Sequence, residues 1–297
     1  MSGLDVDASS NGRGSDDWYR SWTHFRVARS SAGYCRVTFG HAPINTITAT
    51  TVAELAELVG LIERDPDLNV VVFDSASPDF YLAHYDVEND PSRTAALGVG
   101  PTGLPAWLDV LVRLSRAPVV SIASIRGCAR GAGSEFVLAC DLRFASRENT
   151  LLGQFEVGIG VIPGGGPMAR LARLVGRGRA LEILLVADDF DGPRAEQYGY
   201  VNRLIADDRL DDEVEAIASR LARFDHEAIA RTKSYVDEVT LPANSELGPP
   251  LDDFRELFGR PAQQAQWARL QELGLNADSD LERHLGKRVV EVMPDER

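Results

Sequence analysis

Glu135 stands in the part of the chain whose residue types most directly predict chemistry. It is the single acid of the segment Gly127 to Cys140, GCARGAGSEFVLAC, in which glycine and alanine precede an apolar stretch. Small residues let a ligand lie against bare backbone amides, and a helix that starts there directs free N–H groups and its positive dipole end at negative charge. A carboxylate beside such a site fits acid–base chemistry on a carbonyl compound. On these residues alone, Glu135 is equally well an ordinary first-turn acid of a buried helix.

A second candidate acid, Glu156, follows within GQFEVGIGVIPGGG, residues 153–166. Its neighbours are apolar, so it lies either at a surface turn or in a pocket where loss of water raises its pKa toward the working pH of an acid–base group. Its spacing alone favours the surface turn. The glycines at 164–166 superficially match a dinucleotide-binding fingerprint, but Pro167 better fits the first position of a helix, so we expect no such site there. Histidines at metal-binding spacing are absent, and we expect no metal.

Strands and helices alternate over the first two-thirds of the chain, which predicts an α/β fold. We expect strands at residues 34–39, 68–73, 119–125, 142–145 and 201–205, and helices at 51–64, 104–112, 168–175 and 180–186. Thr51 and Glu54 have the spacing of a capping box, which would start the first of these helices. The strand at 119–125 leads through the glycine-rich turn into the helix that carries Glu135.

From about Asp207 onward the pattern becomes helical only and ends in one more amphipathic helix at 281–297. We therefore divide the chain into a disordered N-terminal tail at 1–18, an α/β core at 19–206 and a C-terminal helical region at 207–297. Because proline and glycine interrupt the helical region, and such a region often packs against a neighbouring subunit, we expect an oligomer.

The composition is that of a globular protein, with 44% hydrophobic and 26% charged residues. Its apolar runs fall short of the roughly 18 residues of a membrane span, and the polar start lacks the pattern of a secretory signal. A net charge of −14 disfavours nucleic acid and anionic membranes as partners. Arginines that flank the glycine-rich segments are compatible with a phosphorylated small ligand. The three cysteines lack metal-ligand spacing and fit a reducing compartment, so we expect a cytoplasmic location.

Five segments of the chain are similar, in order, to motif blocks of one known family. They are residues 42–47, APINTI; 80–87, FYLAHYDV; 126–141, which hold the glycine-rich turn; 156–166, EVGIGVIPGGG; and 199–202, GYVN. These blocks resemble those of the crotonase family, also called the enoyl-CoA hydratase/isomerase superfamily. The resemblance extends from about Thr23 to the helix of Lys233. It implies a crotonase-like spiral of β-β-α units with a C-terminal helical region.

The resemblance also implies a role for each matching residue. The backbone N–H groups of Tyr85 and Ala132 would form an oxyanion hole for a thioester carbonyl, where each donor is worth about 10² to 10³ in rate. Glu135 and Glu156 match the two catalytic glutamates of the hydratase branch. The positions that match substrate-binding parts of the motifs, along which coenzyme A and the acyl group would lie, are Ala83, His84, Asp86, Gly131, Gly164 and Lys233.

The activity implied by the resemblance is the addition of water to the 2,3 double bond of an enoyl-CoA through a thioester enolate. Coenzyme A is then part of the substrate, and no separate cofactor is expected. The family further implies a homotrimer, or a hexamer of two trimers, and a place in fatty acid metabolism. Double-bond isomerisation, hydrolysis, carbon–carbon cleavage and a catalytically silent CoA-binding role stay open as alternatives.

Several residues depart from the family pattern and bear on the substrate rather than on the fold. His84 and Tyr85 replace small residues beside the oxyanion hole, and we expect their side chains to reshape the acyl or pantetheine channel. Backbone donation from Tyr85 survives the change because it needs only the N–H group. His84 either adds a titrating group or is a loop histidine without a chemical role. Arg130 and Phe155 replace a small or apolar residue and a proline.

Overall fold

The computed structural model describes residue 18 and residues 20–86 and 91–292, and its strands form one mixed sheet. The strands are β1 (Phe25–Ser31), β2 (Tyr34–Phe39), β3 (Val70–Ser75), β4 (Phe80–Leu82), β5 (Val120–Arg130), β6 (Leu142–Gly153), β7 (Phe190–Asp191) and β8 (Arg203–Ile205). Their order is β1-β2-β3-β5-β6-β7, with β4 paired to β5 and β8 paired to β6. The β1–β2 and β6–β7 pairs are antiparallel, and the other pairs are parallel.

The long strands β5 and β6 each serve two parts of the sheet. The first half of β5, residues 122–125, pairs with the first half of β6; β3 lies beside this part of β5 and β8 beside this part of β6. The second half of β5, residues 127–130, pairs with the second half of β6; β4 lies beside this part of β5 and β7 beside this part of β6. The register shifts between Ile125 and Gly127. Gly127 has a φ of 72°, and a Cβ there would overlap the backbone of Asp79. This glycine therefore lets β5 continue past the shift and pair with β4.

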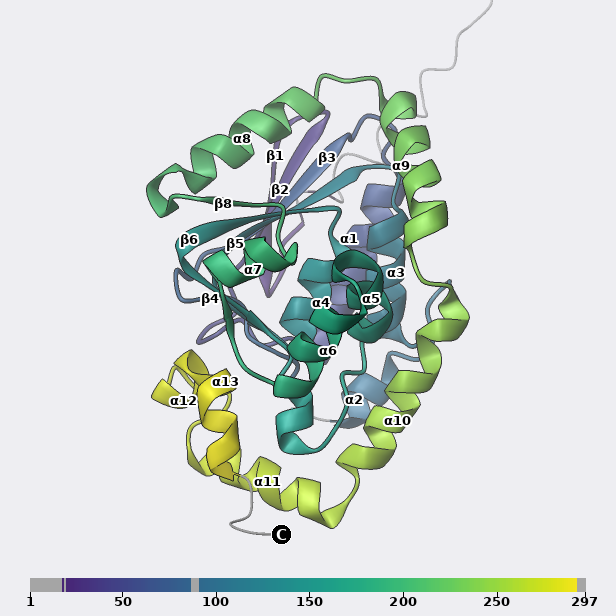
Figure 1. The fold of residues 1–297 in the computed structure, drawn as a ribbon. Helices are drawn as coiled ribbons and strands as arrows, with labels where there is room; N and C mark the ends of the chain where they lie inside the picture. Colours follow the sequence, from purple (N-terminus) through teal and green to yellow (C-terminus); the bar gives the residue numbers. More distant parts are fainter. Residues whose placement is uncertain (1–17, 19, 87–90, 293–297) are drawn as a thin grey trace, which may run out of the picture.

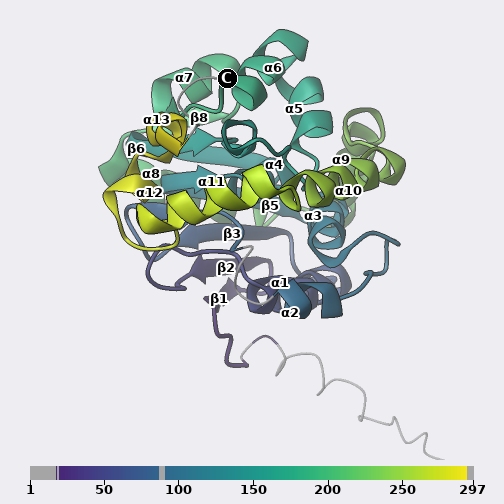
Figure 2. The same ribbon diagram turned by 90° about the horizontal axis from the view of Figure 1, so that it is seen from below.

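Helices cover both faces of the sheet and one end of the molecule (Figures 1 and 2). The longer ones are α1 (Ala49–Arg64), α2 (Pro91–Ala96), α3 (Ala106–Arg116), α4 (Ala132–Ala139), α5 (Pro167–Val175), α6 (Arg177–Val186), α7 (Gly192–Tyr198), α8 (Leu210–Leu221), α9 (His226–Thr240), α10 (Gly248–Phe258) and α11 (Pro261–Glu272). The short ones are η2 (Glu156–Ile159), η3 (Asp207–Arg209), η4 (Asn244–Glu246), α12 (Asp280–Arg283), α13 (Leu285–Arg288) and η5 (Val289–Val292).

The core is divided between the two faces of the sheet by the alternation of side chains along each strand. Val71 and Phe73 of β3 face the main cluster, which α1, α3 and α4 complete. Val70 and Val72 face the opposite side, where α8 contributes the buried residue Val214. The sheet is therefore buried on both faces, as parallel strands normally are.

The C-terminal helices form a band across one end of the fold. Figure 2 shows α10 and α11 crossing that end from α9 toward α12 and α13. Helices α11, α12 and α13 pack back on the core, where Phe155 and Ile159 share an apolar cluster with Trp267, Leu281 and Leu285. The band therefore lies against η2, the element that carries Glu156.

The predicted α/β class is confirmed, and several predicted bounds are wrong. The strand predicted at 34–39 is β2, and Pro167 begins α5 as expected. The glycine-rich turn is shorter than predicted because its first residues, 127–130, pair with β4 and β6 and thus belong to β5. The single helix expected at 281–297 is broken into α12, α13 and η5, and residues 293–297 lie outside the described part.

The predicted capping box begins three residues too late in the sequence. Thr48 is the N-cap of α1, and its side chain and that of Thr51 form the reciprocal pair of hydrogen bonds. Glu54 instead accepts from the backbone N–H groups of Thr23 and His24 at 2.6 and 3.0 Å. A threonine is enough at the third position because its hydroxyl reaches the N-cap amide.

The division of the chain at residues 18 and 206 stays a prediction, although two observations bear on it. Trp18 is 4% exposed within the main core, and the other residues of the predicted tail lie outside the described part. Every strand that the structure describes ends by Ile205, and the described elements after it are helical. Within the described residues, we find no helix with the length and apolar character that crossing a membrane requires.

Candidate active site

Tyr85 lies in the loop after β4, where a backbone bridge fixes its amide. Ile47 donates its N–H to the carbonyl of His84 and accepts from the N–H of Asp86, both at 2.8 Å. In such a parallel bridge the residue between the two hydrogen bonds points its own N–H away from the partner strand. Among the described residues we find no acceptor for the Tyr85 N–H. This amide is therefore available to a ligand.

Ala132 supplies a second available amide at the first position of α4. Gly131, the N-cap, has φ 50° and ψ −122°, which favours glycine, and a Cβ there would lie 2.7 Å from Glu156 Oε1. Gly133 packs so closely on the carbonyl of Leu82 that any side chain would overlap it. The first N–H groups of a helix lack partners within the helix. Within the described part of the chain the Ala132 N–H has no acceptor either.

Glu135 is 3% exposed, and two donors hold its carboxyl group. Trp107 Nε1 donates to Oε2 at 2.9 Å, and the Gly165 N–H donates to Oε1 at 2.6 Å. A Cβ on Gly165 would overlap this carboxyl, so only glycine fits there. Burial raises the pKa of Glu135, and the two hydrogen bonds and the charge of Arg170 offset part of that increase. These donors stabilise the carboxylate form.

Glu156 is 7% exposed at the start of η2, and its surroundings favour the protonated form. Burial first, and then the charge of Glu135, raise the pKa of Glu156 to about 8. The surface turn that its spacing favours is therefore wrong. The hydrophobic contacts of Phe155 and Ile159 with the C-terminal helices explain why, since they cover this turn from outside.

A chain of polar side chains leads away from Glu156 into the core. When the amide nitrogen of Gln154 faces Glu156, it donates to Oε2 and Oε1 at 3.2 and 3.3 Å, and the amide oxygen accepts from Ser134 Oγ at 3.2 Å. Ser134 Oγ in turn contacts the hydroxyl of Tyr200. In the reverse orientation the amide nitrogen donates to the Gly131 carbonyl at 3.4 Å, and the amide oxygen then faces Glu156. Gln154 can thus serve either protonation state of Glu156.

The structure brings the four proposed catalytic groups together, and glycine contacts account for their proximity. Gly131 touches the Glu156 carboxyl and directly precedes Ala132, while the charge of Glu135 acts on Glu156. The ring of Tyr85 stacks edge-on against that of Trp107, which holds Glu135. The roles of these groups remain predictions, but their placement is that of one site.

The predicted substrate-binding residues of the β4 loop differ in their access to a ligand. Ala83 and His84 are each 1% exposed, so their side chains do not line an open channel. The Ala83 N–H donates to the main-chain carbonyl of Asn45 at 3.3 Å. The side-chain nitrogen of Asn45 donates to the carbonyls of Phe80 and Tyr81. Asn45 therefore fixes β4 and the start of the loop that follows it.

Gly164 and Asp86 contact the C-terminal region, whereas the side chain of Tyr85 turns toward α2. A Cβ on Gly164 would lie 2.9 Å from the side chain of Leu251 in α10, so α10 covers the glycine loop. Asp86 Oδ1 accepts from the side chain of Asn276 at 3.3 Å. The hydroxyl of Tyr85 bonds to Thr94 Oγ1 at 3.0 Å, which directs the side chain toward α2.

Lys233 is not brought to this site. Its Nζ donates to Asp141 Oδ2 at 2.7 Å and to the Val119 carbonyl at 3.0 Å. Val119 precedes β5, whereas Ala132 follows its other end, and a strand of this length spans about 30 Å. The predicted contact of Lys233 with the same coenzyme A therefore finds no support in this arrangement, and the residue instead fastens α9 to the sheet.

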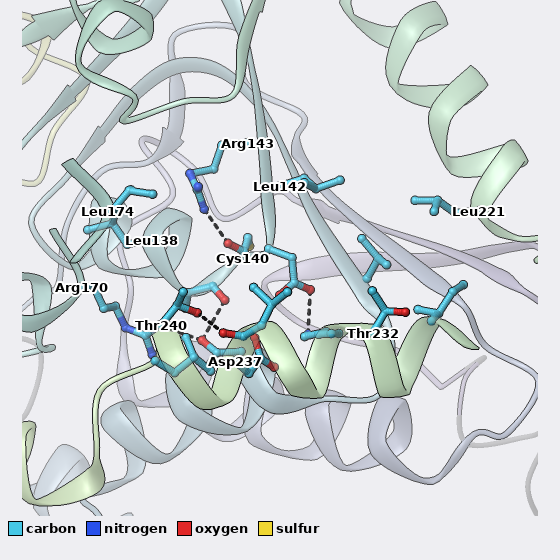
Figure 3. A pocket seen from close by; sticks show the side chains of 18 of the residues that line it. Leu138, Cys140, Leu142, Arg143, Arg170, Leu174, Leu221, Thr232, Asp237 and Thr240 are labelled. Carbon is cyan, nitrogen blue, oxygen red and sulfur yellow. Dashed lines mark hydrogen bonds and ion pairs between the residues drawn. The ribbon is translucent and has the colours of Figure 1, made fainter. Parts of the chain in front are cut away.

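The same region holds a pocket of about 870 Å³ between α9 and the core (Figure 3). Leu138, Arg170, Leu174 and Asp237 lie around it in the figure, with α9 along one side. Of the described residues that line it, none is one of the four proposed catalytic residues. The pocket is therefore distinct from the site of the glutamates.

Three residues of the site were missed by the sequence analysis. Trp107 lies in the helix predicted at 104–112 and Gln154 in the segment that holds Glu156, but neither has a predicted role, and the motif match indicates Gly164 rather than Gly165. Gly165 lies in a run of three glycines, which signals a close approach without saying which residue makes it. The described residues contain no group of three or more His, Cys, Asp or Glu side chains placed to hold a metal ion.

Comparison with known proteins agrees with the geometry. Residues 29–258 match the model of the family described as Enoyl-CoA hydratase/isomerase. The Crotonyl-CoA hydratase of Syntrophomonas wolfei is 30% identical over 197 residues, which cover 66% of this chain and 74% of that protein. A crystal structure from Streptomyces avermitilis, described as a "putative enoyl-CoA hydratase", has a TM-score of 0.86 and 40% identity. It covers 91% of this chain and 97% of that one.

The fold and the paired glutamates thus define a member of the crotonase superfamily, as the sequence motifs predict. More narrowly, the chain belongs to the enoyl-CoA hydratase/isomerase family and is an enzyme of that family.

Proposed function

We propose that this enzyme adds water across the 2,3 double bond of an enoyl-CoA thioester. The observation that carries the proposal is the contrast between two buried carboxyl groups beside two available amides. Glu135 accepts two hydrogen bonds that favour its ionised form, whereas Glu156 has a pKa of about 8 and holds a proton at neutral pH. A base and an acid of this kind are what hydration requires.

The proposed reaction proceeds through an enolate of the thioester. The N–H groups of Tyr85 and Ala132 donate to the carbonyl oxygen, on which negative charge develops. Ionised Glu135 removes a proton from water, the water oxygen bonds to C3, and the π electrons move toward the carbonyl. Protonated Glu156 then gives its proton to C2 and the carbonyl reforms. One water molecule is consumed, and the proton on Glu135 returns to Glu156 through solvent.

Coenzyme A enters this scheme as part of the substrate, and we propose no separate cofactor. The proposal places the enzyme in the cytoplasm and in fatty acid metabolism. Three buried cysteines, none of them in a disulfide, support a reducing compartment. The curated relatives named as acting on crotonyl-CoA and short-chain enoyl-CoA support an acyl-CoA substrate.

A homotrimer, or a hexamer of two trimers, is part of the proposal. Exposed apolar side chains on α9, namely Tyr235, Val236 and Val239, are 54–79% exposed and support a further contact surface. Sedimentation analysis of the purified enzyme should give three or six times the chain mass. A monomer at micromolar concentration would contradict this part of the proposal.

The reaction is tested by loss of the conjugated-thioester absorbance of short- and medium-chain 2-enoyl-CoA esters. We expect turnover by the wild type, and a loss of about 10² or more in kcat for Glu135→Gln and for Glu156→Gln. Release of free coenzyme A would point to a hydrolase, and a shifted double bond to an isomerase. Binding of coenzyme A with no turnover of any ester, in wild type and variants alike, would identify a silent member.

A further inference from the structure

Residues 276–289, which we call the C-terminal clamp, reach the proposed oxyanion hole through a buried ion pair. Glu282 of α12 is fully buried, and its Oε1 accepts from His84 Nε2 at 2.7 Å. The same oxygen accepts the N–H of Asn276 at 2.8 Å. His84 directly precedes Tyr85, and its Nδ1 lies 3.2 Å from the Tyr85 carbonyl. The clamp therefore holds the residue next to one proposed oxyanion donor.

Arg130 connects the clamp to the second proposed donor. Arg130 is 1% exposed, and its Nη1 donates to the main-chain carbonyl of Glu282 at 2.6 Å. Its Nη2 donates to the Arg283 carbonyl at 3.2 Å, and its Nε and Nη2 donate to Asp189 at 2.5 and 2.9 Å. Arg130 stands two residues before Ala132. Residues 282 and 283 of the clamp thus bind the neighbours of both proposed oxyanion donors, Tyr85 and Ala132.

The clamp also packs against the residues around Glu156. A Cβ added to Gly158 would lie 2.9 Å from the side chain of Val289 in the clamp. The helix η2 and the clamp therefore meet without space for a side chain at Gly158. Gly286 approaches Asp189 more closely still, because a Cβ added to Gly286 would lie 2.5 Å from the Asp189 backbone nitrogen. The ring of Phe155, next to Glu156, lies edge-on to His84 at 5.7 Å.

We infer that Glu282 is a positioning residue for both oxyanion amides. Its carboxylate holds His84 and thereby fixes α12, so that the main-chain carbonyls of Glu282 and Arg283 stay on Arg130. The inference rests on the proposed function, since it assigns these amides to the thioester carbonyl. His84, Arg130 and Phe155 are three positions where the chain departs from the family pattern, and all three meet at the clamp. A shared structural purpose accounts for the three departures together.

The charges of the cluster balance, which fits a permanent fastening. Burial lowers the pKa of His84, but the charge and hydrogen bond of Glu282 raise it, and the net shift is upward. Burial raises the pKa of Glu282, but His84, the N–H of Asn276 and the charge of Arg130 together more than offset that effect. Two cations, His84 and Arg130, thus face two carboxylates, Glu282 and Asp189. Removing one partner of a buried pair leaves an uncompensated charge, which is strongly unfavourable.

Glu282→Gln tests the inference because it keeps the side-chain shape and removes the charge. We expect kcat for the best enoyl-CoA to fall about 10- to 100-fold, as displaced catalytic groups do, with KM changed less than about threefold. Asp280→Asn is the matched control. Asp280 is 71% exposed and pairs with His284 and Arg288 inside the clamp, so kcat should stay within about twofold of wild type.

Hydrogen–deuterium exchange gives a readout that does not depend on turnover. In Glu282→Gln, peptides that contain Tyr85 and peptides that contain Ala132 should both exchange faster, while peptides of α1 and α8 keep their rates. Unchanged exchange in both site peptides, or a raised KM at unchanged kcat, would overturn the inference. If wild type hydrates no ester, the proposed function fails, and the exchange rates still decide whether the clamp holds the two loops.

A double variant keeps the test decisive if Glu282→Gln does not fold. His84→Gln combined with Glu282→Gln removes both members of the ion pair and leaves no unpaired charge between them. We expect this variant to fold and to retain the lowered kcat and faster exchange at both site peptides. Wild-type kcat and exchange in the double variant would contradict the inference.

Discussion

At the scale of single residues, environment separates two chemically identical side chains. Glu135 and Glu156 are both buried carboxyl groups. Glu135 accepts from two separate donors, Trp107 and Gly165, one on each oxygen, whereas Glu156 accepts from Gln154 in one of the two orientations of that amide. Burial first, and then the charge of Glu135, raise the pKa of Glu156 to about 8. Opposed environments of this kind suit the acid and the base of the proposed reaction.

The pH dependence of kcat/KM follows from these two shifts. Activity should fall as pH rises through about 8, because Glu156 then loses the proton that it must donate. It should also fall on the acid side, at a pH above the ordinary 4.5 of a glutamate, because the pKa of Glu135 is raised and its carboxylate becomes protonated. In Glu156→Gln the alkaline limb should vanish from the residual activity. An alkaline limb that persists unchanged in this variant would show that another group supplies the proton.

Gly165→Ala should displace the proposed base, Glu135, and leave its charged group in the chain. The new methyl group would overlap the Glu135 carboxyl and displace the amide that donates to it. We expect kcat to fall about 10²-fold and the free energy of unfolding to fall by about 1–3 kcal/mol. Gly178→Ala, where a Cβ meets nothing within 4 Å, is the matched control. Steady-state kinetics and thermal melts measure both; wild-type kcat in Gly165→Ala would refute the close contact.

At the scale of elements, β5 determines where the site forms. It continues beyond Gly127 and pairs with β4, so that the loop after β4 and the start of α4 lie together. Gly133 then lets α4 pack directly on the carbonyl of Leu82. The distance between the two ends of β5 also separates the site from Lys233.

Lys233→Met should therefore act on stability rather than on coenzyme A binding. The variant loses a charged hydrogen bond to Asp141 and one to the Val119 carbonyl, and Asp141 keeps its bonds from the backbone and side chain of Ser121. We expect unfolding free energy to fall by about 1–3 kcal/mol, and KM for an enoyl-CoA to stay within about twofold. A tenfold rise in KM at unchanged stability would instead place Lys233 at the coenzyme A.

Local elements with strong periodicity were predictable from the sequence. β2, the start of α5 and the helical character of the C-terminal region follow from side-chain alternation, from Pro167 and from apolar stripes. β1, β4, β7, α2 and α7 were not foreseen, since they are short or polar and depend on their neighbours. The extension of β5 was hidden because glycine normally weakens a strand, and only pairing with β4 and β6 offsets that effect.

For the candidate site, the sequence predicts only those residues that match a family motif. The motif resemblance placed Tyr85, Ala132, Glu135 and Glu156 in one site, and the structure brings them together. It offered no means of finding Trp107, which belongs to a separate helix, or of locating Glu156 beneath the C-terminal helices. Such contacts join residues far apart in the sequence, and no local pattern records them.

At the scale of the whole molecule, the C-terminal helices α10–α13 return to the proposed site. Figures 1 and 2 show α10–α13 crossing from α9 to the region of β4 and β6. His84 and Glu282, which are 198 residues apart in the sequence, form the contact at which this path ends. The helical region thus contacts the proposed site as well as offering a candidate surface for assembly.

The central proposal is that Glu135 and Glu156 add water to the 2,3 double bond of an enoyl-CoA from one face. The most direct measurement is the position of deuterium in the product formed by wild type from its best 2-enoyl-CoA in D₂O, determined by NMR. We predict a 3-hydroxyacyl-CoA with one deuterium at C2, on the same face as the new hydroxyl group. Deuterium at C4 with a shifted double bond, or addition across opposite faces, would contradict the account.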